Sequence, residues 1–296
     1  MKRKKVIALI TAALTFTMTV CGSLTAAAAS ELTAESKPAT QYTIDANQEV
    51  YALLDFEDTA EFENATKGQI ASPDTLDIYD ENGKLVWSQT AYAFLDQDAP
   101  DTANPSLWRD TQLNHIYGLF EVTDGIYQVR GYDMSNVTFI KGDTGWIVVD
   151  PLMSVECAQA ALALVEENLG TFPVKAVIYS HSHVDHFGGV KGIVSEEEVQ
   201  AGNVQVIAPE GFEKHAVSEN IYAGTAMGRR ASYQYGTMLE GGETGSLPLV
   251  LVWDSPRAAQ VIFLLHLKSH KLVRSIPLTE WKLNFSLLRA PKHRQR

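Results

Sequence analysis

The chain has 296 residues, of which 45% are hydrophobic and 20% are charged, and its formal net charge is −12 at pH 7. This composition is ordinary for a globular protein of one or two domains. The acidic balance argues against a nucleic-acid partner, because phosphate binding needs clustered Lys and Arg. The charge is uneven, since residues 247–296 hold two acidic residues against nine basic ones.

The first 29 residues have the three parts of a secretory signal peptide. A basic segment at residues 2–5 precedes an apolar run at 6–20, and the alanines at 26–29 offer small-residue cleavage sites. We therefore expect a secreted or periplasmic protein that keeps no integral membrane span after cleavage. Two alternatives stay open, a retained membrane anchor and a lipoprotein cysteine at Cys21.

After cleavage one cysteine would remain, Cys157, so no internal disulfide is expected. It lies in a segment with helical periodicity, residues 154–169, that ends before Gly170. We expect Cys157 to be a small core residue of that helix rather than a nucleophile.

The rest of the chain divides into an extension and a regular α/β pattern. Residues 30–50 are polar and are predicted to be an exposed leader, within an N-terminal extension that spans 30–115. From residue 116 onward, runs with β-type alternation or continuous apolar character predict strands at 120–122, 126–129, 137–140, 146–149, 174–179 and 204–208. Residues 209–226 are predicted to be mostly helical. Strands that alternate with helices in this way predict a sheet covered by helices.

Directly after the predicted strand at 174–179 comes a dense group of metal-binding side chains. Three histidines and one aspartate occur within six residues: His181, His183, Asp185 and His186. We expect the first two to bind one ion and the last two to bind a second, because imidazole and carboxylate suit zinc and similar divalent ions. Paired ions of this kind activate a shared water for hydrolysis. Asp185 is also the candidate catalytic residue, since its carboxylate could orient that water.

The metal motif and its flanks resemble the alkylsulfatases, the branch of the metallo-β-lactamase superfamily that hydrolyses dodecyl sulfate and related detergents. The segments that carry the resemblance are residues 118–122, 131–136, 142–152, 181–199 and 207–236. The resemblance implies an αββα sandwich with two zinc ions, often dimeric, with a C-terminal lipid-carrier-like domain. It implies that the four motif residues are ligands, and that two glutamates and one histidine further along complete the site.

The same resemblance suggests residues for binding the sulfate group of a small-molecule alkyl sulfate. Asn220, Arg229 and Arg230 lie in one matching segment, and the planar guanidinium group pairs well with oxyanions. The alternative for the two arginines is a solvated helix face or a structural ion pair.

The resemblance covers residues 42–246 and stops after Ser246, where the family continues with a TPGTEAPAE segment that carries a ligand glutamate. Codons allowed for residues 288–296, read in a shifted frame, can encode PGTEAPAE. Our hypothesis is that residues 247–296 are an irregular, out-of-frame tail, arising in the gene or in its record. Residues 116–246 would then be the N-terminal half of the metallo-β-lactamase domain, with an incomplete second metal site.

The function that we predict is zinc-dependent hydrolysis of alkyl sulfate esters, impaired in this truncated chain. Two alternatives stay open. One is another hydrolase of the superfamily, such as a lactamase or a thioesterase, and the other is an inactive zinc-binding fragment.

Overall fold

The computed structural model describes residues 37–236, 239, 241–247 and 273–276, and the chain divides into two units, 1–38 and 39–296. The predicted signal peptide and most of the predicted out-of-frame tail lie outside the described residues. Within the described residues, none of the helices combines the length and the apolar character that crossing a membrane requires.

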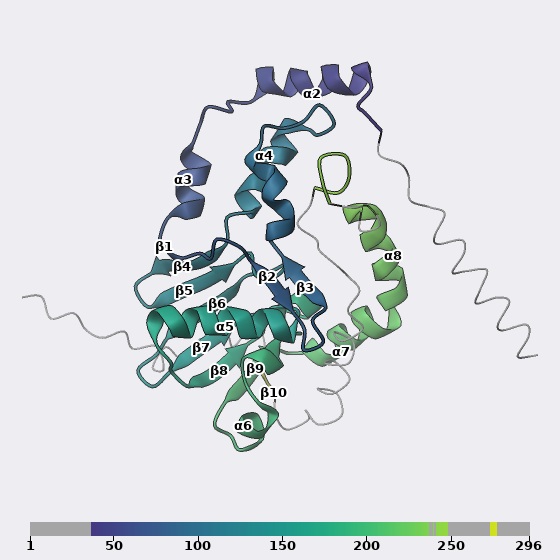
Figure 1. Cartoon of the computed structure of the whole chain (residues 1–296). Helices are drawn as coiled ribbons and strands as arrows, with labels where there is room; N and C mark the ends of the chain where they lie inside the picture. The colour runs from purple at the N-terminus through teal and green to yellow at the C-terminus, as the bar shows by residue number, and fades with distance from the viewer. Residues whose placement is uncertain (1–36, 237–238, 240, 248–272, 277–296) are drawn as a thin grey trace, which may run out of the picture. The chain divides into compact units, whose positions relative to one another are not determined.

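The second unit is built on one eight-stranded sheet, labelled in Figure 1. In spatial order its strands are β1 (Gln69–Ala71), β4 (Gly118–Thr123), β5 (Ile126–Arg130), β6 (Val137–Lys141), β7 (Trp146–Val149), β8 (Val174–Ile178), β9 (Gln205–Pro209) and β10 (Val273–Ile276). Neighbours from β1 to β7 pair antiparallel, and neighbours from β7 to β10 pair parallel. The predicted strands after residue 116 are confirmed to within two residues at each end.

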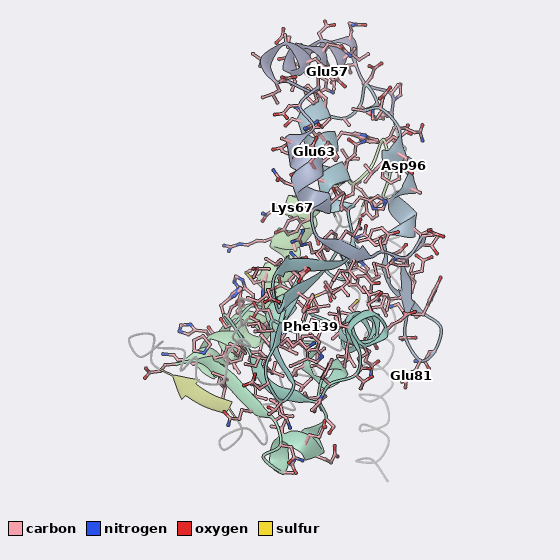
Figure 2. The ribbon with its side chains drawn as sticks, turned by 90° about the vertical axis from the view of Figure 1, so that its left-hand side faces the viewer. Glu57, Glu63, Lys67, Glu81, Asp96 and Phe139 are labelled. Atoms are coloured by element: carbon pink, nitrogen blue, oxygen red, sulfur yellow. The ribbon has the colours of Figure 1, made fainter. Side chains whose placement is uncertain are left out.

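Helix α5 (Val155–Leu169) covers one face of this sheet (Figure 1) and buries Cys157, Ala158, Ala161 and Val165. Its first turn is capped by Ser154, whose side chain accepts from the Cys157 backbone N–H at 3.1 Å. In Figure 2 Phe139 lies inside the molecule beside this helix, whereas Glu57 and Glu63 lie at the surface. The predicted helix and the core position of Cys157 are both confirmed.

The N-terminal extension has more regular structure than its composition suggested. It contains the hairpin of β2 (Asp77–Tyr79) and β3 (Leu85–Ser88), the 3-10 helix η1 (Thr90–Asp96), and the α-helices α2 (Gln41–Leu53), α3 (Ala60–Thr66) and α4 (Pro105–Asn114). Of the expected leader at 30–50 the structure describes residues 37–50, which are exposed or half-buried, and from Gln41 onward they form α2. This helix begins at a Thr40 side-chain cap and has a Gln41–Asp45 hydrogen bond of 2.8 Å one turn apart, which local composition did not reveal.

A small second core ties the extension to the segment 241–247. Its buried members are Tyr92, Leu95, Ala103, Trp108 and Leu247. Beside it, the Thr102 hydroxyl donates to the backbone carbonyl of Glu243 at 2.6 Å. The extension therefore packs against residues 241–247, which follow the last helix that the sequence predicted.

The chain after β8 carries short helices: η2 (Val184–His186), η3 (Val190–Gly192), α6 (Glu196–Gln200), α7 (Phe212–Val217), the π-helix η4 (Ser218–Tyr222) and α8 (Gly224–Tyr235). The mostly helical character predicted for 209–226 is confirmed. The expectation of an irregular tail is wrong at residues 273–276, because β10 extends the sheet by pairing in parallel with β9.

Candidate metal centre

The loop that carries the four predicted ligands leaves the sheet at the carboxyl end of β8. Before it, Tyr179 is fully buried, and its ring centroid lies 5.8 Å from that of Phe187 and 5.2 Å from that of Phe212. After it, a Cβ atom added at Gly189 would lie 2.3 Å from the Pro151 carbonyl oxygen. The loop is thus held at both ends, by aromatic packing and by a backbone approach that only glycine permits.

Ser180 orders the ring of His181. The Ser180 hydroxyl donates to Oδ2 of Asp150 at 2.6 Å, and its oxygen lies 2.8 Å from Nδ1 of His181. A hydroxyl has one proton, and because Asp150 receives it, Nδ1 of His181 must be the donor in the second contact. The neutral ring therefore presents an unprotonated Nε2. Burial, together with the charges of His186 and His183, lowers the pKa of His181 and favours this neutral form.

His183 faces His181 on one side and an acidic residue on the other. Its Nδ1 lies 2.9 Å from Nε2 of His181, and its Nε2 lies 3.3 Å from Oε1 of Glu219 on η4. The ring centroids of the two histidines are 4.6 Å apart. The two nitrogens that face each other are the pair able to share an ion.

His186 lies between two carboxylates. Its Nδ1 lies 3.0 Å from Oδ2 of Asp150, and its Nε2 lies 3.1 Å from Oδ2 of Asp185. Hydrogen bonds to Asp150 and Asp185 raise the pKa of His186 to about 9. Burial alone would raise the pKa values of both carboxyls, but the hydrogen bonds and positive charge of His186, with Ser180 also donating to Asp150, bring them below their ordinary values.

These contacts leave one atom of each motif side chain facing another motif atom. The inward pairs are Nε2 of His181 with Nδ1 of His183, and Oδ2 of Asp185 with Nε2 of His186. Two nitrogens, or a nitrogen and a carboxylate oxygen, bound to zinc at about 2.0–2.2 Å in a tetrahedral site would lie roughly 3.3–3.5 Å apart. The observed 2.9 and 3.1 Å are within a few tenths of that spacing. The donor set therefore fits zinc as two pairs, although among the described residues no three His, Cys, Asp or Glu side chains group around one ion position.

A buried carboxylate supports the segment beneath the loop. Asp133 accepts from the backbone N–H groups of Met134 at 2.6 Å, Met153 at 3.0 Å and Ser154 at 3.2 Å. Burial raises the pKa of Asp133 to about 6, against the lowering effect of these three hydrogen bonds. Two residues on, Ser135 donates to the backbone carbonyl of Asp185, so the segment 133–135 bonds both to the metal loop and to the backbone at 153–154.

The residues suggested for sulfate binding lie on the helices that follow. Asn220 on η4 donates its amide to the Ala216 carbonyl at 2.9 Å, which uses one of its two amide protons locally. Arg229 and Arg230 are exposed on α8, and neither makes an ion pair within the part of the chain that the structure describes. Their role in sulfate binding stays a prediction.

Sequence reasoning missed three residues of this site: Asp150, Ser180 and Glu219. Ser180 directly precedes the motif, and Asp150 directly follows the predicted strand at 146–149. A prediction that this strand pairs in parallel with the strand before the motif would have placed Asp150 beside Ser180. Asp150 also has a positive φ of 56°, uncommon for a residue other than glycine. Nothing in the spacing of Glu219 pointed to His183.

Comparison with known proteins finds similarity to the metallo-β-lactamase superfamily and to alkylsulfatases within it. Residues 130–268 match the family model described as the metallo-beta-lactamase superfamily. A "Linear primary-alkylsulfatase" from Pseudomonas sp is 52% identical over 214 residues, which are 72% of this chain and 32% of that protein. The "Alkyl/aryl-sulfatase BDS1" of Saccharomyces cerevisiae is 50% identical over 198 residues, 67% of this chain and 31% of that protein.

A solved structure agrees with these similarities. The structure of the "stereoselective inverting sec-alkylsulfatase Pisa1 from Pseudomonas sp." superimposes with a TM-score of 0.67 at 53% identity, over 71% of this chain and 33% of that one. The chain thus spans about a third of the length of the relatives that it matches.

Proposed function

Because this chain belongs to the metallo-β-lactamase superfamily and is similar to its alkylsulfatases, we propose that it hydrolyses alkyl sulfate esters at a metal centre on the loop 181–186. The observation that carries the proposal is the convergence of two donor pairs at the end of β8, with every outward nitrogen of the three histidines facing another protein group. We propose zinc as the ion, since three imidazoles and a carboxylate suit it.

A divalent ion held by these residues would supply Lewis-acid chemistry, activating water and offsetting negative charge on an ester oxygen. Hydrogen bonds within the protein fix which ring nitrogens of His181 and His186 carry protons. Nε2 of His181 is already free of a proton through the Asp150–Ser180–His181 chain. His186, with its pKa raised to about 9, must give up its Nε2 proton while Asp150 keeps the proton on Nδ1. The Asp185 carboxylate faces the same position and is the residue that we propose orients the attacking water.

For the substrate we propose a linear alkyl sulfate of the dodecyl sulfate type, with the anionic group near Asn220, Arg229 and Arg230. The printed names of the relatives support an alkyl sulfate, but they include enzymes for both primary and secondary esters. We further propose that the chain works outside the cytoplasm, as its N-terminal segment predicts.

A second candidate is an inactive zinc-binding fragment. It is favoured by the finding that the described residues provide pairs of ligands and no group of three. If these pairs from the described residues are the only protein ligands, each ion would bind weakly and turnover would be low. We therefore expect hydrolysis by this chain to be slower than that of its longer relatives.

The test uses the full chain with zinc added, and it measures bound zinc per chain and sulfate release from dodecyl sulfate, a secondary alkyl sulfate, a β-lactam and a thioester. Sulfate release that disappears in His181→Ala and His186→Ala would support the proposal. Zinc binding without hydrolysis of any substrate would establish the inactive fragment instead. Hydrolysis of the β-lactam or thioester alone would overturn the alkyl sulfate assignment.

A further inference from the structure

The π-helix η4 brings an acidic side chain to the metal loop from a later part of the chain. Oε1 of Glu219 lies 3.3 Å from Nε2 of His183, the nitrogen that faces away from His181. The Glu219 side chain is 27% exposed and that of His183 is 58% exposed. This pair is open to solvent on one side, so its influence on His183 should be moderate in size.

The contact with Glu219 bears on which nitrogen of His183 can bind a metal ion. Nδ1 of His183 faces Nε2 of His181 at 2.9 Å, so it is the nitrogen of this ring placed to bind an ion that the two histidines share. An imidazole nitrogen binds a metal through its lone pair, so Nδ1 carries no proton when an ion is bound. The ring then keeps one proton, and a carboxylate beside Nε2 favours keeping it there.

Each of the other two histidines of the motif also has a protein partner on its outward nitrogen, a hydroxyl for His181 and a carboxylate for His186. Nδ1 of His181 faces the Ser180 hydroxyl at 2.8 Å, and Nδ1 of His186 faces Asp150 at 3.0 Å. We propose that Glu219 is the positioning residue of His183, whose carboxylate holds the proton on Nε2 and leaves Nδ1 free for a metal ion. This inference rests on the proposed metal centre.

The local backbone explains how Glu219 reaches this place. Helix α7 passes into η4 through a wider turn, in which the Ala223 N–H bonds to the Ser218 carbonyl at 3.0 Å across five residues. Insertion of such a π turn changes the direction of the side chains relative to a regular α-helix, and π turns occur often at functional sites. The Asn220 amide bonds back to the Ala216 carbonyl at 2.9 Å and secures the turn.

The experiment compares the full chain with Glu219→Ala, Glu219→Gln and the control Glu210→Ala. Glu210 is exposed and lies between β9 and α7, so its removal deletes one negative charge from the same stretch of chain without touching His183. Zinc affinity is measured by competition with a chromophoric chelator. The protonated nitrogen of His183 is read from 15N shifts of histidine-labelled, zinc-loaded protein, assigned with His183→Gln. Circular dichroism checks that each variant folds.

We expect Glu219→Ala to bind zinc about 10-fold more weakly, within the roughly 10–100-fold range of outer-shell partners. Glu219→Gln should lie between it and the wild type, because the amide oxygen still accepts from Nε2. The control should change affinity less than about 2-fold, and His183 should carry its proton on Nε2 in the wild type.

Two results would overturn the assignment of Glu219. One is a zinc affinity of Glu219→Ala equal to that of the control, and the other is a wild-type His183 with its proton on Nδ1. If the wild-type chain itself binds no zinc, the proposed metal centre fails as well, which separates that failure from an error about Glu219 alone.

Discussion

Oδ2 of Asp150 lies 3.0 Å from Nδ1 of His186, although 36 residues separate them in the chain. The same carboxylate accepts the Ser180 backbone N–H at 2.7 Å and the Ser180 hydroxyl at 2.6 Å. One aspartate therefore orders two of the three motif histidines, His186 directly and His181 through Ser180.

Replacing that aspartate should weaken metal binding without disturbing the backbone. Asn tolerates the positive φ of position 150, so Asp150→Asn keeps the turn but places an amide or an uncharged oxygen against His186. We expect zinc affinity to fall about 10–100-fold, the usual range for partners of ligand histidines. The measurement is chelator competition on the full chain. The control is Asp143→Asn, an exposed residue of the β6–β7 hairpin, and an equal loss in that control would contradict the role of Asp150.

Asp133 should give the protein a pH-dependent stability. Burial raises its pKa from 3.8 to about 6, so the folded chain binds this proton more tightly than the unfolded chain. The corresponding stabilisation is fully present below about pH 4 and is lost as the pH rises through 6. At about 1.4 kcal/mol per pKa unit, the change is at most about 3 kcal/mol.

This pH dependence can be isolated with Asp133→Asn, which cannot ionise. We expect the difference in unfolding free energy between the wild type and this variant to shrink from about pH 4 to about pH 7. Urea denaturation at several pH values provides the measurement. Asp98→Asn at an exposed position should show a difference that does not vary with pH. A wild-type advantage that grows with pH would mean that the pKa of Asp133 is lowered instead.

The glycines behind the metal loop should tolerate no side chain. A Cβ atom at Gly189 would lie 2.3 Å from the Pro151 carbonyl oxygen and 2.5 Å from that of Ser154. Because both atoms belong to the backbone, we expect Gly189→Ala to lower the free energy of unfolding by about 1–3 kcal/mol and to reduce zinc affinity.

A matched glycine substitution provides the control for that variant. A Cβ atom at Gly228 of α8 meets no atom within 4 Å, so Gly228→Ala should stabilise the chain by roughly 0.5–1 kcal/mol through helix propensity. Thermal melts of the two variants should move in opposite directions. A shift of Gly189→Ala in the same direction as Gly228→Ala would show that the loop has room to relax.

The small core between the extension and residues 241–247 should be essential for keeping that extension folded. Trp108 is fully buried in it and donates its indole N–H to the Gln97 carbonyl at 3.0 Å. Trp108→Ala should cost about 3–5 kcal/mol and should make the segment before β1 sensitive to limited proteolysis. Trp108→Phe keeps an aromatic ring and should lose much less. Equal protease resistance of wild type and Trp108→Ala would show that the extension is held elsewhere.

Local sequence determined the strands and the long helix. The apolar run before the metal motif forms β8, and the capped periodic segment after Ser154 forms α5, because side-chain periodicity and capping act within a few residues. Helix α2 and strand β10 were missed. The first lacks a buried face, and the second pairs with β9, which is distant in sequence.

The sequence by itself also determined the chemical character of the site, since three histidines and an aspartate within six residues need no tertiary contact to indicate metal binding. The tertiary structure decided which atom of each side chain faces inward. Asp150 comes from the end of β7 and Glu219 from the π-helix, and they reach His186 and His183 because the sheet order and the turn after α7 bring those elements together. The direction of a ring nitrogen depends on what the opposite nitrogen contacts, and in this protein those partners lie far from the motif in sequence.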